Sequence, residues 1–168
     1  NVISVDGLNA IVIRRFDRKG DKRVHCISAG TAIRASTASG QDPEMGYPEL
    51  ARILRRAGVS ENDVNASDAR ELFKRMVFNI LIDNTDDHEK NHVLLVSQAQ
   101  QYALAPAFDV LPMGQSLGYQ AMAVGTQGAE SSIENALSAA GQYWLTPQAA
   151  KAEVHQVVDV VNAWREHF

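Results

Sequence analysis

The sequence contains one cysteine, Cys26, in 168 residues. A lone thiol cannot form an internal disulfide, and it lacks the second sulfur that would help to build a zinc site. The apolar neighbours Val24 and Ile27 indicate a buried, unreactive side chain. This use of cysteine is typical of a reducing compartment, so we expect a cytoplasmic protein.

Long apolar runs and concentrated positive charge are also absent. No segment approaches the roughly 20 consecutive apolar residues that cross a bilayer, and the N-terminus lacks the basic and apolar regions of a signal peptide. The formal net charge is -4, and the lysines and arginines are scattered. Because duplex binding needs a concentrated basic face, we expect neither a membrane nor nucleic acid as a direct partner.

The hydrophobic content of 45% is sufficient for one core in a chain of this length. Short β-branched runs alternate with longer segments of helical periodicity, which indicates an α+β fold that is mostly helical. The chain begins with Asn1 and enters a strand-like run almost at once. We therefore expect it to be a processed or excised piece of a longer protein.

Local patterns predict the main elements. Apolar residues at helical spacing predict helices over 47–58, 67–84, 131–140 and 146–167. Ser67 and Thr146 are the expected N-caps of the second and last of them. Alternating and β-branched runs predict one hairpin from 8–16 and 22–28, another from 92–96 and 101–105, and a further strand near 119–124.

The stretch TDDHEKN, residues 85–91, lies between the strongest predicted helix and an aliphatic strand. Within it Asp86 precedes Asn91 with four residues between them, as in the catalytic loop of protein kinases. In phosphoryl transfer a carboxylate takes the proton of the attacking hydroxyl, whereas an amide oxygen binds magnesium without adding negative charge. The spacing therefore predicts Asp86 as the base and Asn91 as a metal ligand.

A second acidic residue, Asp109, lies in the segment APAFDVLP after the predicted second hairpin. The kinase arrangement requires such an aspartate to complete the magnesium site. The hairpin between Asn91 and Asp109 can bring both loops to one end, and Pro106 and Pro112 restrict the backbone around the carboxylate. His88 is expected to approach a phosphate or to brace the loop.

Simpler interpretations exist for each of these residues. An Asp and an Asn at this spacing also occur in ordinary polar loops, and Asp109 alone could form a turn. Asp87 and Glu89 are expected to be solvated or to cap the neighbouring helix. Lys90 is either an exposed loop lysine or a phosphate contact. It is the combination of these features that favours phosphoryl transfer.

The segments TDDHEKNHVLLV, LAPAFDVLP and VIRRFDRKGDKRVH resemble the C-terminal part of the HipA family, the serine/threonine kinase toxins of bacterial type II toxin–antitoxin modules. The resemblance covers at least residues 11–112. It implies that residues 1–168 form a single region, the C-terminal lobe of a HipA-like, protein-kinase-like fold with short β-hairpins around the active site. It further implies ATP and Mg²⁺ as cofactors and growth arrest, or persistence, as the outcome.

The resemblance also implies roles for individual residues. Asp86 would be the catalytic base, assisted by His88, and Asn91 and Asp109 would hold magnesium. The residues expected to bind the nucleotide are Arg14, Phe16, His88 and Lys90, the first two through the backbone of the hinge against adenine. Asp17 and Arg18 would support the site. Asp87 stands where several relatives carry glycine, which would add a negative charge beside the phosphates.

Two kinase features have no match in this chain. There is no Gly-rich phosphate loop and no strand lysine in a V-A-I-K-like setting, and in the family both lie upstream of the position of Asn1. We therefore expect these 168 residues alone to bind ATP weakly and to transfer phosphate poorly. The resemblance implies a protein substrate, in known relatives an aminoacyl-tRNA synthetase, and a small DNA-binding antitoxin. It also implies self-phosphorylation on a serine, for which the loop with Ser36, Thr37 and Ser39 is a candidate.

Two other classes of function remain open at this point. A metal-dependent hydrolase could use the side chains of Asp83, Asp87, His88 and His92. A non-catalytic module could instead bind a nucleotide or a protein partner. For that module the candidate docking residues are Tyr143, Trp144 and Trp164, for which burial in the core is the simpler interpretation.

Overall fold

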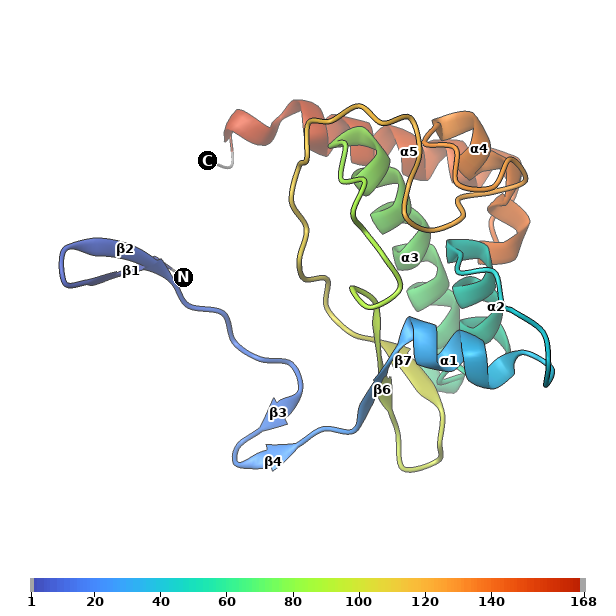
Figure 1. The fold of residues 1–168 in the computed structure, drawn as a ribbon, viewed down its shortest axis with the longest axis horizontal. Coiled ribbons are helices and arrows are strands. Elements are labelled where there is room, and N and C mark those ends of the chain that lie inside the picture. Colours follow the sequence, from blue (N-terminus) through green and yellow to red (C-terminus); the bar gives the residue numbers. More distant parts are fainter. Residues whose placement is uncertain (1, 167–168) are drawn as a thin grey trace.

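A computed structural model describes residues 2–166 of the chain. Helices enclose the core, and a short antiparallel sheet lies beside them (Figure 1). The α-helices are α1 (Ala29–Ser36), α2 (Tyr47–Ala57), α3 (Val64–Leu81), α4 (Ile133–Ser138) and α5 (Pro147–Asn162). The short 3₁₀ helices are η1 (Glu61–Asp63), η2 (Ala140–Tyr143) and η3 (Trp164–Glu166). The strands are β1 (Val2–Val5), β2 (Leu8–Ile11), β3 (Arg18–Lys19), β4 (Lys22–Arg23), β5 (Cys26–Ser28), β6 (Val93–Val96) and β7 (Tyr102–Leu104). The mixed, mostly helical fold predicted from the sequence is confirmed.

Helix α2 forms where the sequence predicts it. Pro48 lies in the first turn, where the missing amide hydrogen has no helical partner to lose. The helix ends at Gly58, whose N–H donates to the carbonyl of Leu54 at 2.9 Å. Leu50 and Leu54 are fully buried, so this face of α2 packs into the core.

Helix α3 begins earlier than its predicted start. The expected cap, Ser67, lies inside the helix, which starts at Val64 instead. Asn62 and Asp63 just before it have φ angles of 54° and 55°. Asn and Asp tolerate this left-handed conformation better than most residues, so they turn the chain directly into the helix. The prediction that Ser67 is the N-cap is therefore wrong.

Strands β5, β6 and β7 form one antiparallel sheet in that order. The predicted second hairpin is confirmed, with Leu94 of β6 opposite Leu104 of β7. Beyond this pair the N–H of Ala105 donates to the carbonyl of Val93 at 2.9 Å. The chain before β6 and the chain after β7 therefore leave the sheet at the same end.

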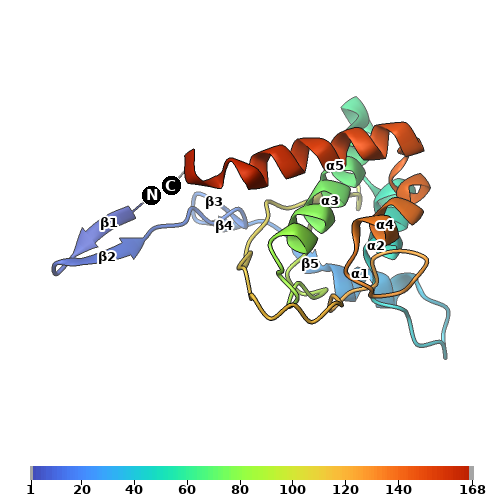
Figure 2. The same ribbon diagram turned by 90° about the horizontal axis from the view of Figure 1, so that it is seen from above.

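The predicted first hairpin is only partly right: the chain turns back after Lys19 to form the short β3–β4 pair, but 8–16 does not pair with 22–28. Strand β2 pairs with β1, and β5 pairs with β6. Asp6 and Gly7 form the turn between β1 and β2 with φ angles of 50° and 80°. An Asp-Gly pair is a strong signal for a two-residue hairpin turn, and it determines the pairing here. Figure 2 shows the β1–β2 hairpin extended away from the helical body.

The predicted strand near 119–124 does not form. Tyr119 makes an isolated antiparallel bridge with Glu130, and Ala123 makes an isolated parallel bridge with Gly46. Each bridge is a single residue pair with a different partner segment, so a continuous ladder of hydrogen bonds cannot develop.

The closing helix α5 has the predicted start. The hydroxyl of Thr146 accepts from the N–H of Ala149 at 3.2 Å, and Pro147 occupies the first helical position. Arg70 of α3 pairs with the buried carboxylate of Glu153, which joins α5 to α3. The predicted helix extended to residue 167, which lies outside the described residues. Within residues 2–166, no helix is long and apolar enough to cross a membrane.

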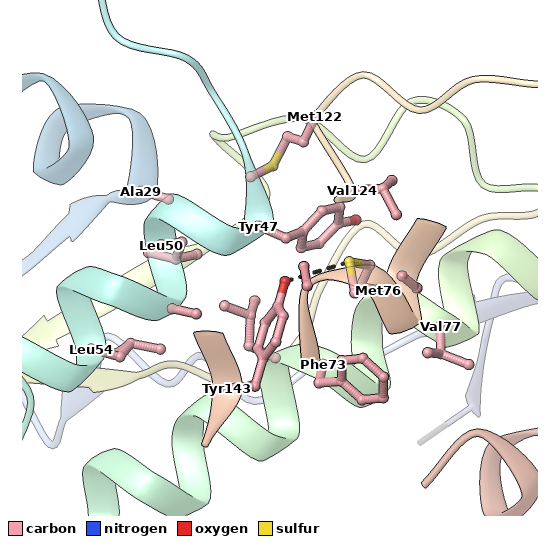
Figure 3. Close-up of a cluster of buried hydrophobic side chains, with 14 of the residues drawn as sticks. Ala29, Tyr47, Leu50, Leu54, Phe73, Met76, Val77, Met122, Val124 and Tyr143 are labelled. Atoms are coloured by element: carbon pink, nitrogen blue, oxygen red, sulfur yellow. Dashed lines mark hydrogen bonds between the residues drawn. The ribbon is translucent and has the colours of Figure 1, made fainter. Parts of the chain in front are cut away.

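The core lies between α2, α3 and the segment that contains η2 (Figure 3). The Tyr143 ring packs edge-on against Phe73 with centroids 5.2 Å apart. Its hydroxyl donates to the sulfur of Met76 at 3.5 Å, and burial raises the pKa of Tyr143. Tyr47 and Met122 are also fully buried. This packing fixes both the start of α2 and the C-terminal half of α3, the two places from which the candidate site is held.

The aromatic residues of the second half divide between the core and the surface. Tyr143 is buried, as expected for a core residue, whereas Trp144 and Trp164 are 44% and 54% exposed. The guanidinium of Arg55 lies 4.9 Å from the centre of the Trp144 ring, a cation–π distance. The expectation that both tryptophans belong to the core is wrong.

Candidate active site

The loop between α3 and β6 carries most of the predicted site. It leaves the helix at Ile82 and turns at Asp83, which has a φ angle of 57°. The N–H of Asn84 donates to the carbonyl of Asn79 at 2.9 Å, and the Asn84 side chain donates to the Asn79 side chain at 3.1 Å. The first residues of the loop are therefore attached to the last turns of α3.

Asp87 is the anchor of this loop. It is 2% exposed, whereas the preceding Asp86 is exposed. Oδ2 of Asp87 accepts from the Asn79 amide at 2.7 Å and from the Tyr47 hydroxyl. Nε2 of His92 lies 2.8 Å from the same oxygen. An ionised carboxylate only accepts hydrogen bonds, so His92 donates through this nitrogen. The expectation that Asp87 is solvated is wrong, although Asp87 does line the cavity that contains Asn91.

Burial and the neighbouring carboxylate affect Tyr47 together. Burial, followed by the negative charge of Asp87 and the hydrogen bond to it, raises the pKa of Tyr47 well above its ordinary value. The hydroxyl therefore stays protonated and available as a donor. The ring of Tyr47 meets the ring of His92 edge-on, with centroids 5.3 Å apart. These two side chains thus support each other as well as the carboxylate.

Helix α1 holds the opposite side of the loop. The N–H of Ala29 donates to the carbonyl of His92 at 2.7 Å, and the N–H of Gly30 donates to the carbonyl of Glu89 at 3.3 Å. Both donors belong to the first turn of α1, whose amide hydrogens lack partners within the helix. A Cβ atom on Gly30 would overlap Cγ of Glu89. The absence of a side chain at this position allows the close approach.

Asn91 is 8% exposed and is oriented by the loop itself. Its N–H donates to the carbonyl of His88 at 2.9 Å, and its side-chain nitrogen reaches the carbonyl of Asp86 at 3.5 Å. The side-chain oxygen is then the end that suits a hard cation such as Mg²⁺. The arrangement fits the metal-binding role predicted for Asn91.

The segment around Asp109 meets the same region. A cavity of about 490 Å³ is lined both by Asn91 and by Phe108 and Val110, the two neighbours of Asp109. Asp109 itself is exposed and has a φ angle of 57°. Carboxylate and amide oxygens are the ligands that Mg²⁺ prefers, so the side chains of Asn91 and Asp109 have the chemistry that suits this ion.

Asp83 connects the segment after Asp109 to the first loop. Its carboxylate accepts from the N–H of Ser116 at 2.7 Å, and its carbonyl accepts from the N–H of Met113 at 3.1 Å. The two loops are therefore joined at their bases, in addition to sharing the end of the β6–β7 hairpin.

Of the predicted nucleotide-binding residues, Phe16 lies beside the Asp109 segment. The ring of Phe16 lies 5.9 Å from the ring of Phe108, measured between centroids, so the predicted hinge borders the Asp109 segment. Arg14 and Lys90 are exposed. His88 is half-buried, and its Nδ1 is buried without a hydrogen-bond partner among the described residues.

The carboxylate of Asp17 is held by Arg15 at 2.7 Å and by Arg18 at 2.5 Å. The hydrogen bond from Arg15 is the main cause that lowers the pKa of Asp17 to about 2. Asp17 and Arg18, both predicted to support the site, thus contact each other in the segment that follows Phe16. Their ion pairs restrict the backbone of the predicted hinge.

The alternative hydrolase site does not assemble in the described part of the chain. His88 and His92 lie in the loop rather than on one helical face, and His92 is bound to Asp87. Among residues 2–166, no three side chains of His, Cys, Asp or Glu converge as metal ligands. The predicted ligand set of the hydrolase is therefore not formed.

Tyr47 and Asn79 are parts of the site that the sequence patterns did not predict. Both lie on helices whose other residues were assigned to the core. The one local signal was Asn79 itself, an amide between apolar residues such as Phe78 and Ile80 on a buried helix. A buried amide requires hydrogen-bond partners, which would have directed attention to the polar residues that follow the helix.

Comparisons with known proteins show what the chain is similar to. A family model described as "HipA-like C-terminal domain" matches residues 1–164. "Putative kinase Y4dM" of Sinorhizobium fredii is 29% identical over 161 residues, which cover 95% of this chain and 37% of that protein. "Putative kinase Y4mE" of the same organism is 28% identical over 117 residues, which cover 64% of this chain and 26% of that protein.

A solved structure has the same fold. It is the HipA protein of Shewanella oneidensis, described in a complex with HipB and operator DNA. The TM-score is 0.70 at 13% sequence identity, and the match covers 96% of this chain and 42% of that one. The chain thus spans less than half the length of these similar proteins.

Proposed function

The chain belongs to the HipA-like C-terminal domain family, and from this premise we propose that it is the catalytic C-terminal region of a serine/threonine protein kinase. The reaction would transfer the γ-phosphoryl group of ATP to a hydroxyl of a protein substrate. The family membership and the similarity to two proteins named as kinases support the class of enzyme. The substrate hydroxyl and the cofactors are parts of the proposal.

One observation carries the proposal. The loop with Asp86 and Asn91 and the segment with Asp109 leave the β6–β7 hairpin at the same end, and Asn91 shares a cavity with both neighbours of Asp109. A base, an amide oxygen and a second carboxylate thus belong to adjoining loops, as phosphoryl transfer requires. The exposed position of Asp86 is compatible with access for a hydroxyl group.

Each residue then has one task. Asp86 orients the attacking hydroxyl and takes its proton, whereas Asn91 and Asp109 would hold magnesium. When bound, this ion neutralises charge on the phosphates. His88 and Lys90 are placed in the loop that would approach the phosphates, and the backbone at Arg14 and Phe16 would bind the adenine edge. This set contains no lysine of the kind that clamps the α and β phosphates, so residues 1–168 alone would bind ATP weakly.

The biological setting is also part of the proposal. The similar HipA structure is described as a toxin–antitoxin complex with HipB. We infer an equivalent role for this protein, with a small DNA-binding antitoxin as partner and a growth-arrest or persistence outcome in the bacterial cytoplasm. The protein substrate is inferred to be an aminoacyl-tRNA synthetase or another protein with an accessible serine or threonine.

The test is a transfer assay with the full-length protein, radiolabelled ATP and dephosphorylated casein as a generic acceptor. Asp86→Asn is expected to lower the rate by about a hundredfold or more, the range of a lost general base. Asp109→Asn is also expected to lower the rate strongly, because it removes a charged ligand of the magnesium ion. Removal of Mg²⁺ by a chelator is expected to stop transfer. The matched control is Asp159→Asn, which changes an exposed aspartate of α5.

Retention of the unmodified rate by Asp86→Asn would contradict the assignment of the base. Binding of ATP without transfer by the unmodified protein would contradict the kinase proposal and favour the non-catalytic module. Release of phosphate from a simple monoester without nucleotide, abolished by His92→Ala, would favour the hydrolase.

A further inference from the structure

The buried oxygen of Asp87 brings together three parts of the chain. Asn79 belongs to α3, Tyr47 begins α2, and His92 immediately precedes β6. All three side chains bind the same carboxylate oxygen. Only Asp87 belongs to the turn between the predicted base and the predicted metal ligand.

We propose that Asp87, Tyr47, Asn79 and His92 are positioning residues, which orient the loop that carries Asp86. They would act by fixing the backbone of the loop; the side chains of Asn79, Asp87 and His92 also line the cavity that contains Asn91. This inference rests on the proposed kinase function, and it adds to that function a set of residues that determine the rate through loop geometry.

The geometry of adjacent residues supports the inference. Asp86 is exposed, whereas Asp87 is buried, so consecutive side chains point to opposite sides of the loop. The hydrogen bonds to the Asp87 carboxylate hold this side chain in place. They thereby restrict the peptide group between Asp86 and Asp87. That restriction limits the directions in which the Asp86 carboxylate can point.

The same restriction extends to the predicted metal ligand. The carbonyl of Asp86 accepts from the Asn91 side chain, and the carbonyl of His88 accepts from the Asn91 N–H. Both carbonyls belong to the residues on either side of Asp87. A shift of Asp87 would therefore move the two groups that orient Asn91.

Tyr47 and Asn79 give the anchor its rigidity. Both side chains are buried, and both lie on helices that pack in the core. The side chain of Asn79 also accepts from Asn84 at the start of the loop. The loop is consequently held at Asn84 and at Asp87 by one residue of α3. Preorganised support of this kind is what separates a precise site from a loose one.

A second buried tyrosine provides the matched control. Tyr143 lies in the same core, but its hydroxyl donates to the sulfur of Met76 rather than to a loop residue (Figure 3). Tyr143→Phe and Tyr47→Phe each remove one buried hydroxyl. Only the second change removes a donor from Asp87.

The experiment compares these variants in the full-length protein, together with His92→Leu and His92→Gln. We expect Tyr47→Phe and His92→Leu to lower kcat by about tenfold to a hundredfold, the range known for residues that orient metal ligands. For Tyr47→Phe, KM for ATP is expected to change by less than about twofold, because Tyr47 is not among the residues that line the cavity. His92→Gln keeps a side-chain donor and is expected to recover most of the lost rate.

Hydrogen exchange measured by mass spectrometry provides an independent readout. In Tyr47→Phe and His92→Leu the amides of residues 84–92 are expected to exchange faster, with residues 69–77 of α3 unchanged. Unchanged exchange and kcat in both variants would overturn the inference. An equal loss of kcat and an equal rise in exchange in Tyr143→Phe would also overturn the inference, because they would indicate general destabilisation.

A failure of the proposed function can be distinguished from a failure of the positioning role. If the unmodified protein transferred no phosphate, the kinase proposal would be contradicted. The exchange rates would then still decide whether the hydrogen bonds to Asp87 fix the loop. If the exchange rates rose but an active enzyme kept its kcat, the positioning role would be rejected.

Discussion

The carboxylate of Asp87 accepts a hydrogen bond from the hydroxyl of Tyr47, which lies 40 positions earlier in the chain. This contact joins the first residue of α2 to the turn of the candidate catalytic loop. It explains how a charged side chain occupies a buried position while the adjacent Asp86 remains exposed. The two consecutive aspartates therefore have separate tasks, one structural and one chemical.

The first prediction concerns stability. Asp87→Ala leaves the buried donors of Tyr47, Asn79 and His92 without their shared acceptor. The free energy of unfolding is expected to fall by about 3 kcal/mol, measured by urea denaturation. Asp86→Ala is the matched control and is expected to change it by less than about 0.5 kcal/mol, because the side chain is exposed. Equal effects of the two substitutions would contradict the structural role of Asp87.

The second prediction concerns the contact between α1 and the loop. In Gly30→Ala the new Cβ would overlap Cγ of Glu89, so the Glu89 side chain, the loop or the helix must shift. We expect phosphate transfer to fall by about tenfold or more, because small displacements of reacting groups have large effects on rate. Gly141→Ala is the control, since no atom lies within 4 Å of its added Cβ. A Gly30→Ala enzyme with the unmodified rate would show that this approach is not required.

The third prediction concerns pH. Burial raises the pKa of Asp68 above 3.8, although the carboxylate accepts from the N–H of Leu104 at 2.7 Å. The folded protein therefore favours the protonated form. The resulting stabilisation is complete below pH 3.8 and is lost as the pH rises through the raised pKa.

Asp68→Asn removes this titration and keeps an oxygen for the Leu104 N–H. As the pH rises from 3.8, the unfolding free energy of the unmodified protein is expected to fall relative to that of the Asn variant. Urea denaturation at several pH values measures it. A difference that is constant across this range would contradict the raised pKa.

Much of the fold could be predicted because its signals are local. Pro48 and Gly58 mark the two ends of α2, and Thr146 and Pro147 mark the start of α5. The β6–β7 hairpin follows from two short aliphatic runs. The predicted pairing of 8–16 with 22–28 is wrong because the Asp-Gly pair at residues 6–7 turns β2 back onto β1.

The candidate loop could be located from the spacing of Asp86 and Asn91, but its anchor could not. Whether Asp87 is buried depends on Tyr47 and Asn79, and no local pattern connects these residues. Tertiary contacts also decided the exposure of Trp144, which lies against Arg55 at the surface rather than in the core. Burial of single polar or aromatic residues was therefore the least predictable feature.

The proposed magnesium site is tested most directly by a crystal structure of the full-length protein with Mg²⁺ and a non-hydrolysable ATP analogue. We expect one magnesium ion with ligands from the Asn91 side-chain oxygen and the Asp109 carboxylate at about 2.0–2.1 Å. We also expect the Asp86 carboxylate to face the γ-phosphate. A bound nucleotide whose metal ion contacts neither Asn91 nor Asp109 would contradict the central claim.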